Sequence, residues 1–295
     1  MVAVSKSAVG RFVITPSGRA LGADVAGVDL RRPLAPGEVE AIRHAWAEHL
    51  VLRFRGQRRL TLEQLAAFSR NFGELDRAPI RSDPRGQVSP DEHPEITVIS
   101  NVIVDGRPIG GLGAYEAVWH ADMTYNPRPP KGSALYAVEI PPTGGNTHFA
   151  NMYLAYETLP PDLKHRAETL KCVHDASRNS AGELRIGFTD VSDPSKTVGA
   201  VHPVVRTHPE TGRKCLFLGR RRNAYLVGLP LEESEALLDA LWAYAVRPEL
   251  VWEQVWQVDD IVLWDNRCTM HRRDSFDPGS RRLLYRTQIV GEEVT

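Results

Sequence analysis

The first residues in this chain whose types and spacing could do chemistry are His120 and Asp122, in the segment AVWHADMTY. If the segment is a strand, side chains two residues apart project from the same face, so the imidazole and the carboxylate would point together. They would supply two ligands of a two-histidine, one-carboxylate triad, which leaves three positions of an octahedral metal open. Because oxygen-activating Fe(II) enzymes require open positions, the pair predicts a non-haem iron site.

Two other histidine–acid pairs have the same spacing, in the HPE sequences at 93–95 and 208–210. Their central proline favours strand edges and turns, and HPETG at 208–212 is typical of a hairpin tip. His120 instead follows two apolar residues at the head of a strand-like stretch. We therefore prefer the pair at 120–122.

The third ligand must come from a distant part of the chain, and several of the ten histidines remain candidates. His271 is the strongest, because it follows the strand-like IVLWD at 261–265 and the turn-forming Asn266. It also comes late enough for the chain to return beside His120. We predict that His120, His271 and the carboxylate of Asp122 form the metal and catalytic centre.

The next strand-like segment, RRLLYRTQIV at 281–290, carries Arg282 and Arg286 on one face. Buried guanidinium groups need anionic partners. One of them could fork onto the distal carboxylate of a 2-oxoglutarate that chelates the metal, and the other could hold a second anion. The alternative is that both arginines lie on the surface of an edge strand.

Short strands dominate the second half of the chain, and a few helices interrupt them. Helices are expected at about 36–49, 61–72, 151–170 and 231–246. Strands are expected near 50–54, 95–102, 118–125, 132–140, 145–149, 171–175, 201–206, 214–218, 250–256, 260–264 and 281–290. This pattern favours a mostly β jelly roll with packed helices over a parallel α/β sheet, which needs regular strand–helix alternation. We expect one domain over residues 1–295, with lid or substrate loops at about 76–118.

The overall composition excludes several classes of protein. The chain has 295 residues and a formal net charge of -1, which gives no electrostatic case for a nucleic-acid partner. The three cysteines, Cys172, Cys215 and Cys268, are too far apart for a disulfide framework or a zinc–thiolate site. Neither a signal peptide nor a membrane span is evident, so we expect a cytoplasmic protein, and a homo-oligomer remains open.

Several segments together resemble the taurine dioxygenase and aryloxyalkanoate dioxygenase family, and they follow in order along nearly the whole chain. They are LRFRGQ (52–57), FSRNFGEL (68–75), AVWHADMTY (117–125), PPTGGNTHFANMYLAYETLP (141–160), HPVVRTHPETGRKCLFLGR (202–220), VDDIVLWDNRCTMHR (258–272) and SRRLLYRTQIVG (280–291). The resemblance implies a double-stranded β-helix fold, Fe(II) as the cofactor and 2-oxoglutarate as the cosubstrate.

The resemblance also implies roles for particular residues. The iron ligands of the family match His120, Asp122 and His271. Arg282, eleven residues after the last of these, matches the arginine that binds the distal carboxylate of 2-oxoglutarate, and Thr147 matches the hydroxyl that assists it. Arg286 matches the position that binds the anionic head of the prime substrate. Trp264 matches a tryptophan beside the iron.

The chain departs from the taurine dioxygenases at two places. The stretch DRAPIRSD (76–83) lacks the His and Tyr that line the taurine pocket, and Glu116 replaces an Asn before the iron-binding histidine. Taurine is therefore a poor candidate for the substrate. Tyr115 and Glu116 are expected near the iron as substrate-binding residues, and Glu116 could instead neutralise Arg286.

The resemblance implies hydroxylation of a small organic anion at the expense of O2 and 2-oxoglutarate. An aryloxyalkanoate, a sulfonate or a sulfate ester would fit, with C–O or C–S cleavage when the hydroxylated carbon bears a heteroatom. Two alternatives stay open: the same chemistry on an amino acid or other zwitterion, and a non-catalytic jelly-roll metal-binding protein. Asp122 argues against a third, a halogenase. A halogenase requires a small residue in place of Asp122.

Overall fold

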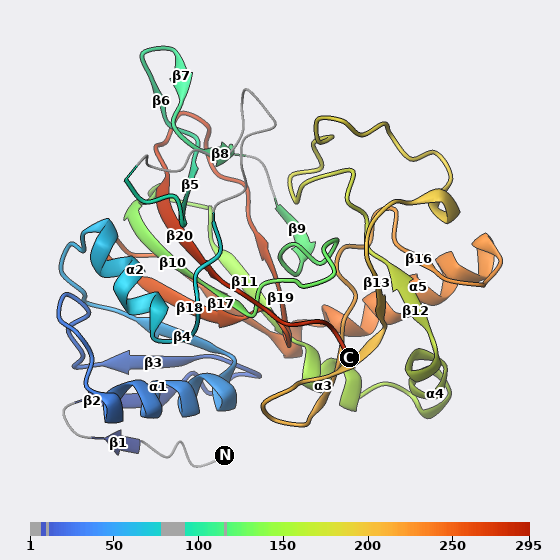
Figure 1. Cartoon of the computed structure of the whole chain (residues 1–295), viewed down its shortest axis with the longest axis horizontal. Helices are drawn as coiled ribbons and strands as arrows, with labels where there is room; N and C mark the ends of the chain where they lie inside the picture. Colours follow the sequence, from blue (N-terminus) through green and yellow to red (C-terminus); the bar gives the residue numbers. More distant parts are fainter. Residues whose placement is uncertain (1–6, 10–11, 78–91, 115–116) are drawn as a thin grey trace.

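Two β-sheets form the framework of the protein in this computed structural model, which describes residues 7–9, 12–77, 92–114 and 117–295 (Figure 1). The large sheet has the strand order β1-β2-β3-β4-β18-β10-β20-β5-β8, and the small sheet has the order β17-β11-β19-β9. Neighbouring strands come from distant parts of the chain, as in β18, β10 and β20. The predicted double-stranded β-helix is confirmed.

The strands of the two sheets have the following bounds. The large sheet contains β1 (Ser7–Val9), β2 (Phe12–Pro16), β3 (Ala23–Ala26), β4 (Val51–Phe54), β5 (Ile96–Ser100), β8 (Gly111–Leu112), β10 (Gly132–Glu139), β18 (Ile261–Asp265) and β20 (Leu283–Ile289). The small sheet contains β9 (Ala117–His120), β11 (Thr147–Asn151), β17 (Val251–Gln254) and β19 (Thr269–Arg273).

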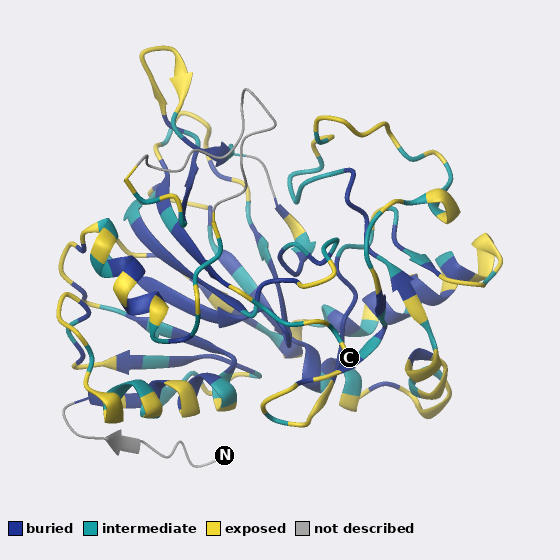
Figure 2. Cartoon of the chain, viewed as in Figure 1, coloured by how far each residue is buried: buried dark blue, intermediate teal, exposed yellow. Residues whose placement is uncertain are grey.

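Two helices, α1 (Pro36–His49) and α2 (Leu62–Arg70), cover the outer face of the large sheet (Figure 1). Proline at the first position of α1 supplies the preset φ that a helix start favours. Thr61 caps α2, because its hydroxyl accepts a hydrogen bond from the Gln64 amide at 3.2 Å. Both helices carry buried as well as exposed residues (Figure 2). Trp46, Phe68 and other apolar side chains form one core cluster with the sheet.

The remaining elements pack beside the small sheet. They are the helices α3 (Met152–Glu157), α4 (Pro161–Thr169) and α5 (Leu231–Ala245), the strands β12 (Lys171–Val173), β13 (Val201–Pro203) and β16 (Tyr225–Leu226), and the hairpin of β14 (Val205–Thr207) and β15 (Lys214–Leu216). A second core cluster joins α3 and α5 to the interior between the sheets. The helical insertion expected at 151–170 restarts at Pro160 and Pro161, as predicted, and therefore forms the two helices α3 and α4.

The segment expected to form lid loops, at about 76–118, is only partly a loop. Residues 78–91 and 115–116 lie outside the described residues. All of β5 is buried, and it pairs with β20, so this part belongs to the framework. Beyond β5, the strands β6 (Ile103–Val104) and β7 (Arg107–Pro108) form an exposed hairpin, and β8 returns the chain to the sheet edge.

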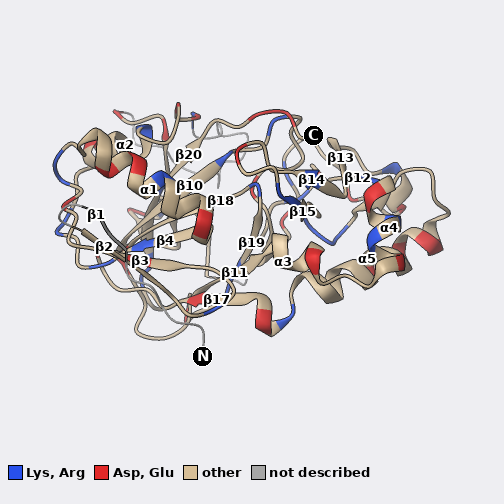
Figure 3. Cartoon of the chain, turned by 90° about the horizontal axis from the view of Figure 1, so that it is seen from below, with Lys and Arg blue, Asp and Glu red and all other residues tan. Residues whose placement is uncertain are grey.

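Acidic and basic side chains are interspersed over the elements, in keeping with the small net charge (Figure 3). Within the described ranges, no helix combines the length and the apolar character needed to cross a membrane.

Candidate metal centre

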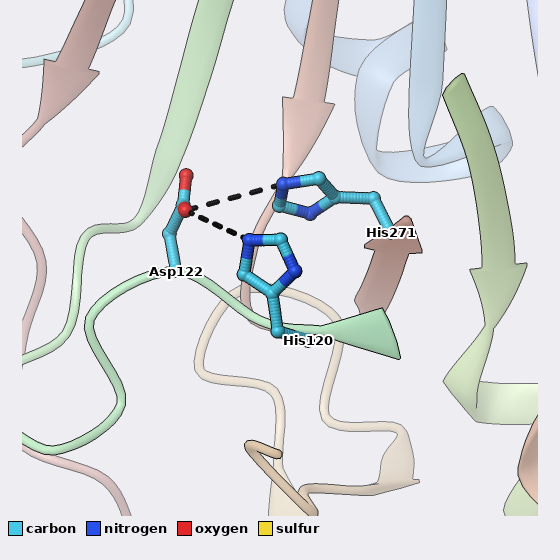
Figure 4. A group of neighbouring side chains, drawn as sticks. All are labelled: His120, Asp122 and His271. Carbon is cyan, nitrogen blue, oxygen red and sulfur yellow. Dashed lines mark ion pairs between the residues drawn. The ribbon is translucent and has the colours of Figure 1, made fainter. Parts of the chain in front are cut away.

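His120, Asp122 and His271 meet in the interior between the two sheets (Figure 4). β9 pairs with β19 so that His120 lies opposite His271, and their ring centroids are 4.2 Å apart. Asp122 Oδ1 lies 3.6 Å from His120 Nε2 and 3.9 Å from His271 Nε2. One ligand atom from each residue lies within 4.8 Å of the other two, close enough to share one metal ion.

The strand predicted at 118–125 is too long. The prediction that His120 and Asp122 point the same way because they share a strand is therefore wrong. β9 ends at His120, and Asp122 begins a turn in which Met123 has a φ of 50°. Asn266 holds the turn: it accepts from the Asp122 amide at 2.7 Å and donates to the Asp122 carbonyl at 3.0 Å. The carboxylate is therefore aimed by a side-chain clamp from the β18–β19 connection.

Both histidines are suited to bind a metal through Nε2. Nδ1 of His120 lies 2.7 Å from the Val118 carbonyl, which can only accept, so Nδ1 carries the proton and the lone pair is on Nε2. Burial, and after it the neighbouring His120, lowers the pKa of His271 to about 3. The neutral imidazole is the form that ligates metals.

The contacts of the Asp122 carboxylate with its other neighbours are long. Nη1 of Arg286 lies 3.3 Å from both oxygens, the Ser133 hydroxyl 3.4 Å from Oδ2 and the Gln288 amide 3.5 Å from Oδ2. Burial by itself raises the pKa of Asp122, but the Arg286 charge and the two histidines outweigh it and lower the pKa. The group is thus an anionic ligand whose neighbours stand at the outer limit of hydrogen bonding.

A cavity of about 50 Å³ opens beside the side chains of His120 and His271. Its described lining includes the apolar side chains of Ile99, Leu112, Ala117, Leu135 and Trp264. The Trp264 ring lies 5.1 Å from the His271 ring, as expected for a tryptophan beside the iron. Three arginines also line the cavity: Arg273, Arg282 and Arg286.

Arg282 is a buried cation whose hydrogen-bonding groups are only partly used by the described residues. Only 1% of it is exposed, and Nη2 donates to the Gly145 carbonyl at a long 3.3 Å. Its Nε has no hydrogen-bond partner among the described residues. Burial, and after it the charge of Arg273, lowers the pKa of Arg282 well below its ordinary value. Because a buried guanidinium is costly without an anion, the site fits a carboxylate-bearing cosubstrate.

The turn before β11 makes room for Arg282. Gly144 and Gly145 have φ values of 75° and 67°, which only glycine adopts at little cost. A Cβ at position 145 would meet Arg282 Nε at 3.2 Å. Thr147 follows with its side chain lining the cavity, as the sequence predicts, and its hydroxyl accepts from Trp256 Nε1 at 3.0 Å.

Some residues of this region differ from expectation. Tyr115 and Glu116, predicted to bind substrate, lie outside the described residues. The sequence reasoning missed Asn266 as a clamp and Arg273 in the cavity. The alternation of strand side chains could have found Arg273, since it stands two residues beyond His271.

Two other groups in the described residues have metal-ligand spacing: His208 with Asp265 and Cys268, and His148 with Glu253 and Asp274. The first is fully buried and closed by an ion pair, in which Arg267 Nη2 lies 2.6 Å from Asp265 Oδ2. The second is partly exposed, with His148 Nε2 2.7 Å from Asp274 Oδ2. Neither group lines the cavity described above.

Known proteins resemble this chain along nearly its whole length. Residues 14–288 match the family model described as taurine catabolism dioxygenase TauD, TfdA family. An alpha-ketoglutarate-dependent 2,4-dichlorophenoxyacetate dioxygenase from Cupriavidus pinatubonensis is 36% identical over 96% of this chain and 99% of its own. An (S)-phenoxypropionate/alpha-ketoglutarate-dioxygenase from Sphingobium herbicidovorans is 34% identical over 95% and 96%.

Solved structures agree with these relatives. A taurine dioxygenase from Burkholderia xenovorans superposes with a TM-score of 0.78 at 37% identity, covering 97% of this chain and 91% of its own. The structure of AAD-2 in complex with Mn(II) and N-oxalylglycine has a TM-score of 0.77 at 34% identity, covering 96% and 99%.

Proposed function

This chain belongs to the TauD, TfdA family and is a 2-oxoglutarate-dependent non-haem iron dioxygenase, and from that premise we propose that it hydroxylates a small organic anion. In this proposal the whole chain forms one catalytic domain. His120, Asp122 and His271 hold Fe(II), which supplies the activation of O2 when it is bound. His120 and His271 also line the cavity, so 2-oxoglutarate and the prime substrate would bind there, next to the metal.

The distal carboxylate of 2-oxoglutarate is assigned to Arg282, with the Thr147 hydroxyl beside it. A planar guanidinium binds a carboxylate through two parallel hydrogen bonds, and Arg282 presents a buried Nε in need of an acceptor. Trp264 and the apolar lining exclude water from the reacting atoms, which strengthens these charged contacts.

The observation that carries the substrate class is the balance of charge around the cavity. Three guanidinium groups line it, and no carboxylate side chain is among its described lining residues, so the lining carries an excess of positive charge. A divalent metal and the two carboxylates of 2-oxoglutarate cancel each other. The excess therefore remains for a prime substrate that carries negative charge.

Arg286 is the residue that we assign to the anionic group of this substrate. It is 8% exposed, faces the cavity and stands against the metal-ligand carboxylate, so an anion bound there would lie beside the metal. The named relatives act on aryloxyalkanoates, and a similar alkylsulfatase from Acinetobacter baylyi is 34% identical over 93% of this chain and 84% of its own. Aryloxyalkanoates and alkyl sulfate esters are accordingly the first candidates.

The test is a panel of paired compounds in an assay of succinate formation with Fe(II), 2-oxoglutarate and ascorbate. Each anion, such as an aryloxyacetate or an alkyl sulfate, is matched with its neutral amide or alcohol. We expect the anions to stimulate succinate formation and the neutral partners to have little effect. Equal stimulation by the neutral partners, or a preference for amino acids, contradicts the proposal.

A further inference from the structure

Arg273 lines the same cavity as Arg282 and Arg286, but the proposed function gives it no role. It lies on β19 two residues beyond His271, and residues two apart on a strand face the same way. Only 6% of Arg273 is exposed. It is therefore a buried cation that projects into the interior beside the metal centre.

The pairing of β11 with β19 places Arg273 at one end of the cavity. In this pairing Thr147 lies directly opposite Arg273, and Phe149 lies opposite His271. Residues directly opposite in an antiparallel pair share a face, with Cβ atoms about 4.5–5.5 Å apart. Arg273 is thus the neighbour of Thr147, about 7 Å along the strand from the metal-binding histidine.

Arg273, on β19, and Arg282, directly before β20, converge on one aromatic ring. Their Cζ atoms lie 5.5 Å and 5.9 Å from the centroid of Phe276. Burial lowers the pKa of Arg273 to about 10, and the Arg273 charge adds to the effect of burial on Arg282. Two buried cations that repel each other are stabilised when an anion binds between them.

A backbone contact orients the Arg273 side chain. Nη2 donates to the Leu112 carbonyl at 3.0 Å, and Leu112 itself lines the cavity from β8. Leu112 has a φ of 71°, an unusual conformation for a residue other than glycine. The guanidinium is therefore held against the edge of the cavity rather than extended toward solvent.

We propose that Arg273 is a second cationic residue for the distal carboxylate of 2-oxoglutarate. The carboxylate lies between Arg273 and Arg282, with the Thr147 hydroxyl beside it. This inference rests on the cosubstrate site of the proposed function. The neighbouring Thr147 and the shared Phe276 ring favour the cosubstrate over the prime substrate as the anion bound by Arg273.

Calorimetric titration of the Mn(II)-loaded protein tests the inference without turnover. The ligands are 2-oxoglutarate and 2-oxopentanoate, which has the same carbon chain but lacks the distal carboxylate. The variants are Arg273→Gln, Arg282→Gln and the control Arg206→Gln. Arg206 is 2% exposed and its Cζ lies 4.9 Å from the Phe217 ring, but it is on β14 and does not line the described cavity.

We expect Arg273→Gln and Arg282→Gln each to weaken 2-oxoglutarate binding by about tenfold or more, since each loses a charged hydrogen bond. The binding of 2-oxopentanoate should stay unchanged, and Arg206→Gln should bind both ligands like the wild type. Should Arg273→Gln fail to fold, Arg273→Lys replaces it. Lysine keeps the charge without the planar fork, so the expected weakening is smaller.

The outcomes separate the inference from the proposed function. If Arg282→Gln loses affinity and Arg273→Gln or Arg273→Lys does not, the inference is overturned and the proposed cosubstrate site stands. Equal weakening of both ligands by the Arg273 variant also overturns it, because the effect is then not on the distal carboxylate. If neither arginine matters, the proposed cosubstrate site is itself wrong.

Discussion

The protein contains two buried groups of histidine, aspartate and arginine that differ mainly in how closely their members contact one another. In the first, which we call the metal corner, Asp122 lies among His120, His271 and Arg286 at distances of 3.3 to 3.9 Å. In the second, the salt cluster, Asp265 lies 2.6 Å from Arg267 Nη2 and 3.1 Å from His208 Nε2.

The difference shows in which group the hydrogen-bonding capacity of the aspartate is already used by the protein. Asp265 also accepts from the Arg267 amide at 2.9 Å, so its hydrogen bonds are short and numerous. The Asp122 carboxylate has only long contacts with neighbouring side chains, and the two histidines of the metal corner line a cavity. Similar residues thus form a structural ion pair in one place and a group with capacity for a ligand in the other.

The largest expected effect is on turnover, at the metal corner. Replacing His271 by Ala should lower the rate by about 10³-fold or more, because a metal's charge stabilisation is worth several kcal/mol. The protein should still fold, with a lower melting temperature, because the His271 ring packs against the rings of Phe149 and Trp264. Steady-state assays and thermal melts of the purified variant measure both. Full activity in the His271→Ala protein contradicts the assignment.

The salt cluster should show the opposite behaviour. Asp265→Ala leaves the 2% exposed Arg267 without its closest carboxylate, and removing one partner of a buried pair costs about 3–5 kcal/mol of unfolding free energy. Glu210 Oε2, 3.1 Å from Arg267 Nη2, should keep the loss near the lower value. Denaturant unfolding measures it. An Asp265→Ala protein as stable as the wild type shows that the short contacts contribute nothing.

Removing Asn266, the clamp on the turn at Asp122, should weaken metal binding less than removing one of the three metal ligands. Asn266→Ala removes the two hydrogen bonds to the Asp122 backbone, and losing support of a ligand typically weakens metal binding by about 10–100-fold. Asn151→Ala is the matched control, because this amide is also buried, donates to the Ala20 carbonyl and caps α3. Equal metal affinities in the two variants would rule out the clamp.

The smallest effect is on the dependence of stability on pH. The Arg267 charge outweighs burial and holds the pKa of Asp265 below its ordinary value of 3.8. The unfolded chain therefore binds a proton more readily, so the stabilisation is present above that value and is lost as the pH falls below it. Unfolding free energies measured from pH 7 down to about 3 should fall less steeply for Asp265→Ala than for the wild type. Parallel curves would show that Asp265 has an ordinary pKa.

Much of this architecture can be predicted from the sequence, because local patterns determine it. Pro36 at the start of α1 and the Gly144–Gly145 turn before β11 identify their elements directly. His120 and His271 could be chosen because each accompanies an apolar strand-like run. The strands that carry the two histidines, β9 and β19, pair with each other in the structure.

The features that sequence reasoning missed depend on contacts between distant segments. Nothing local indicates that Asn266 holds the turn at Asp122, since the two are 144 residues apart. The pairing of Arg286 with Asp122 likewise requires β20 to lie beside the turn after β9. Glu116, which could neutralise Arg286, lies outside the described residues, so that alternative stays a prediction.

The most direct test of the difference between the two groups is the stoichiometry of metal binding. Anaerobic titration with Fe(II), followed by calorimetry, should give one site per chain in the wild type. His208→Ala should keep that site in its folded fraction, because the salt cluster does not hold the metal. His271→Ala should lose it. Loss of the site in His208→Ala, or its retention in His271→Ala, would contradict the assignment of the metal corner as the iron site.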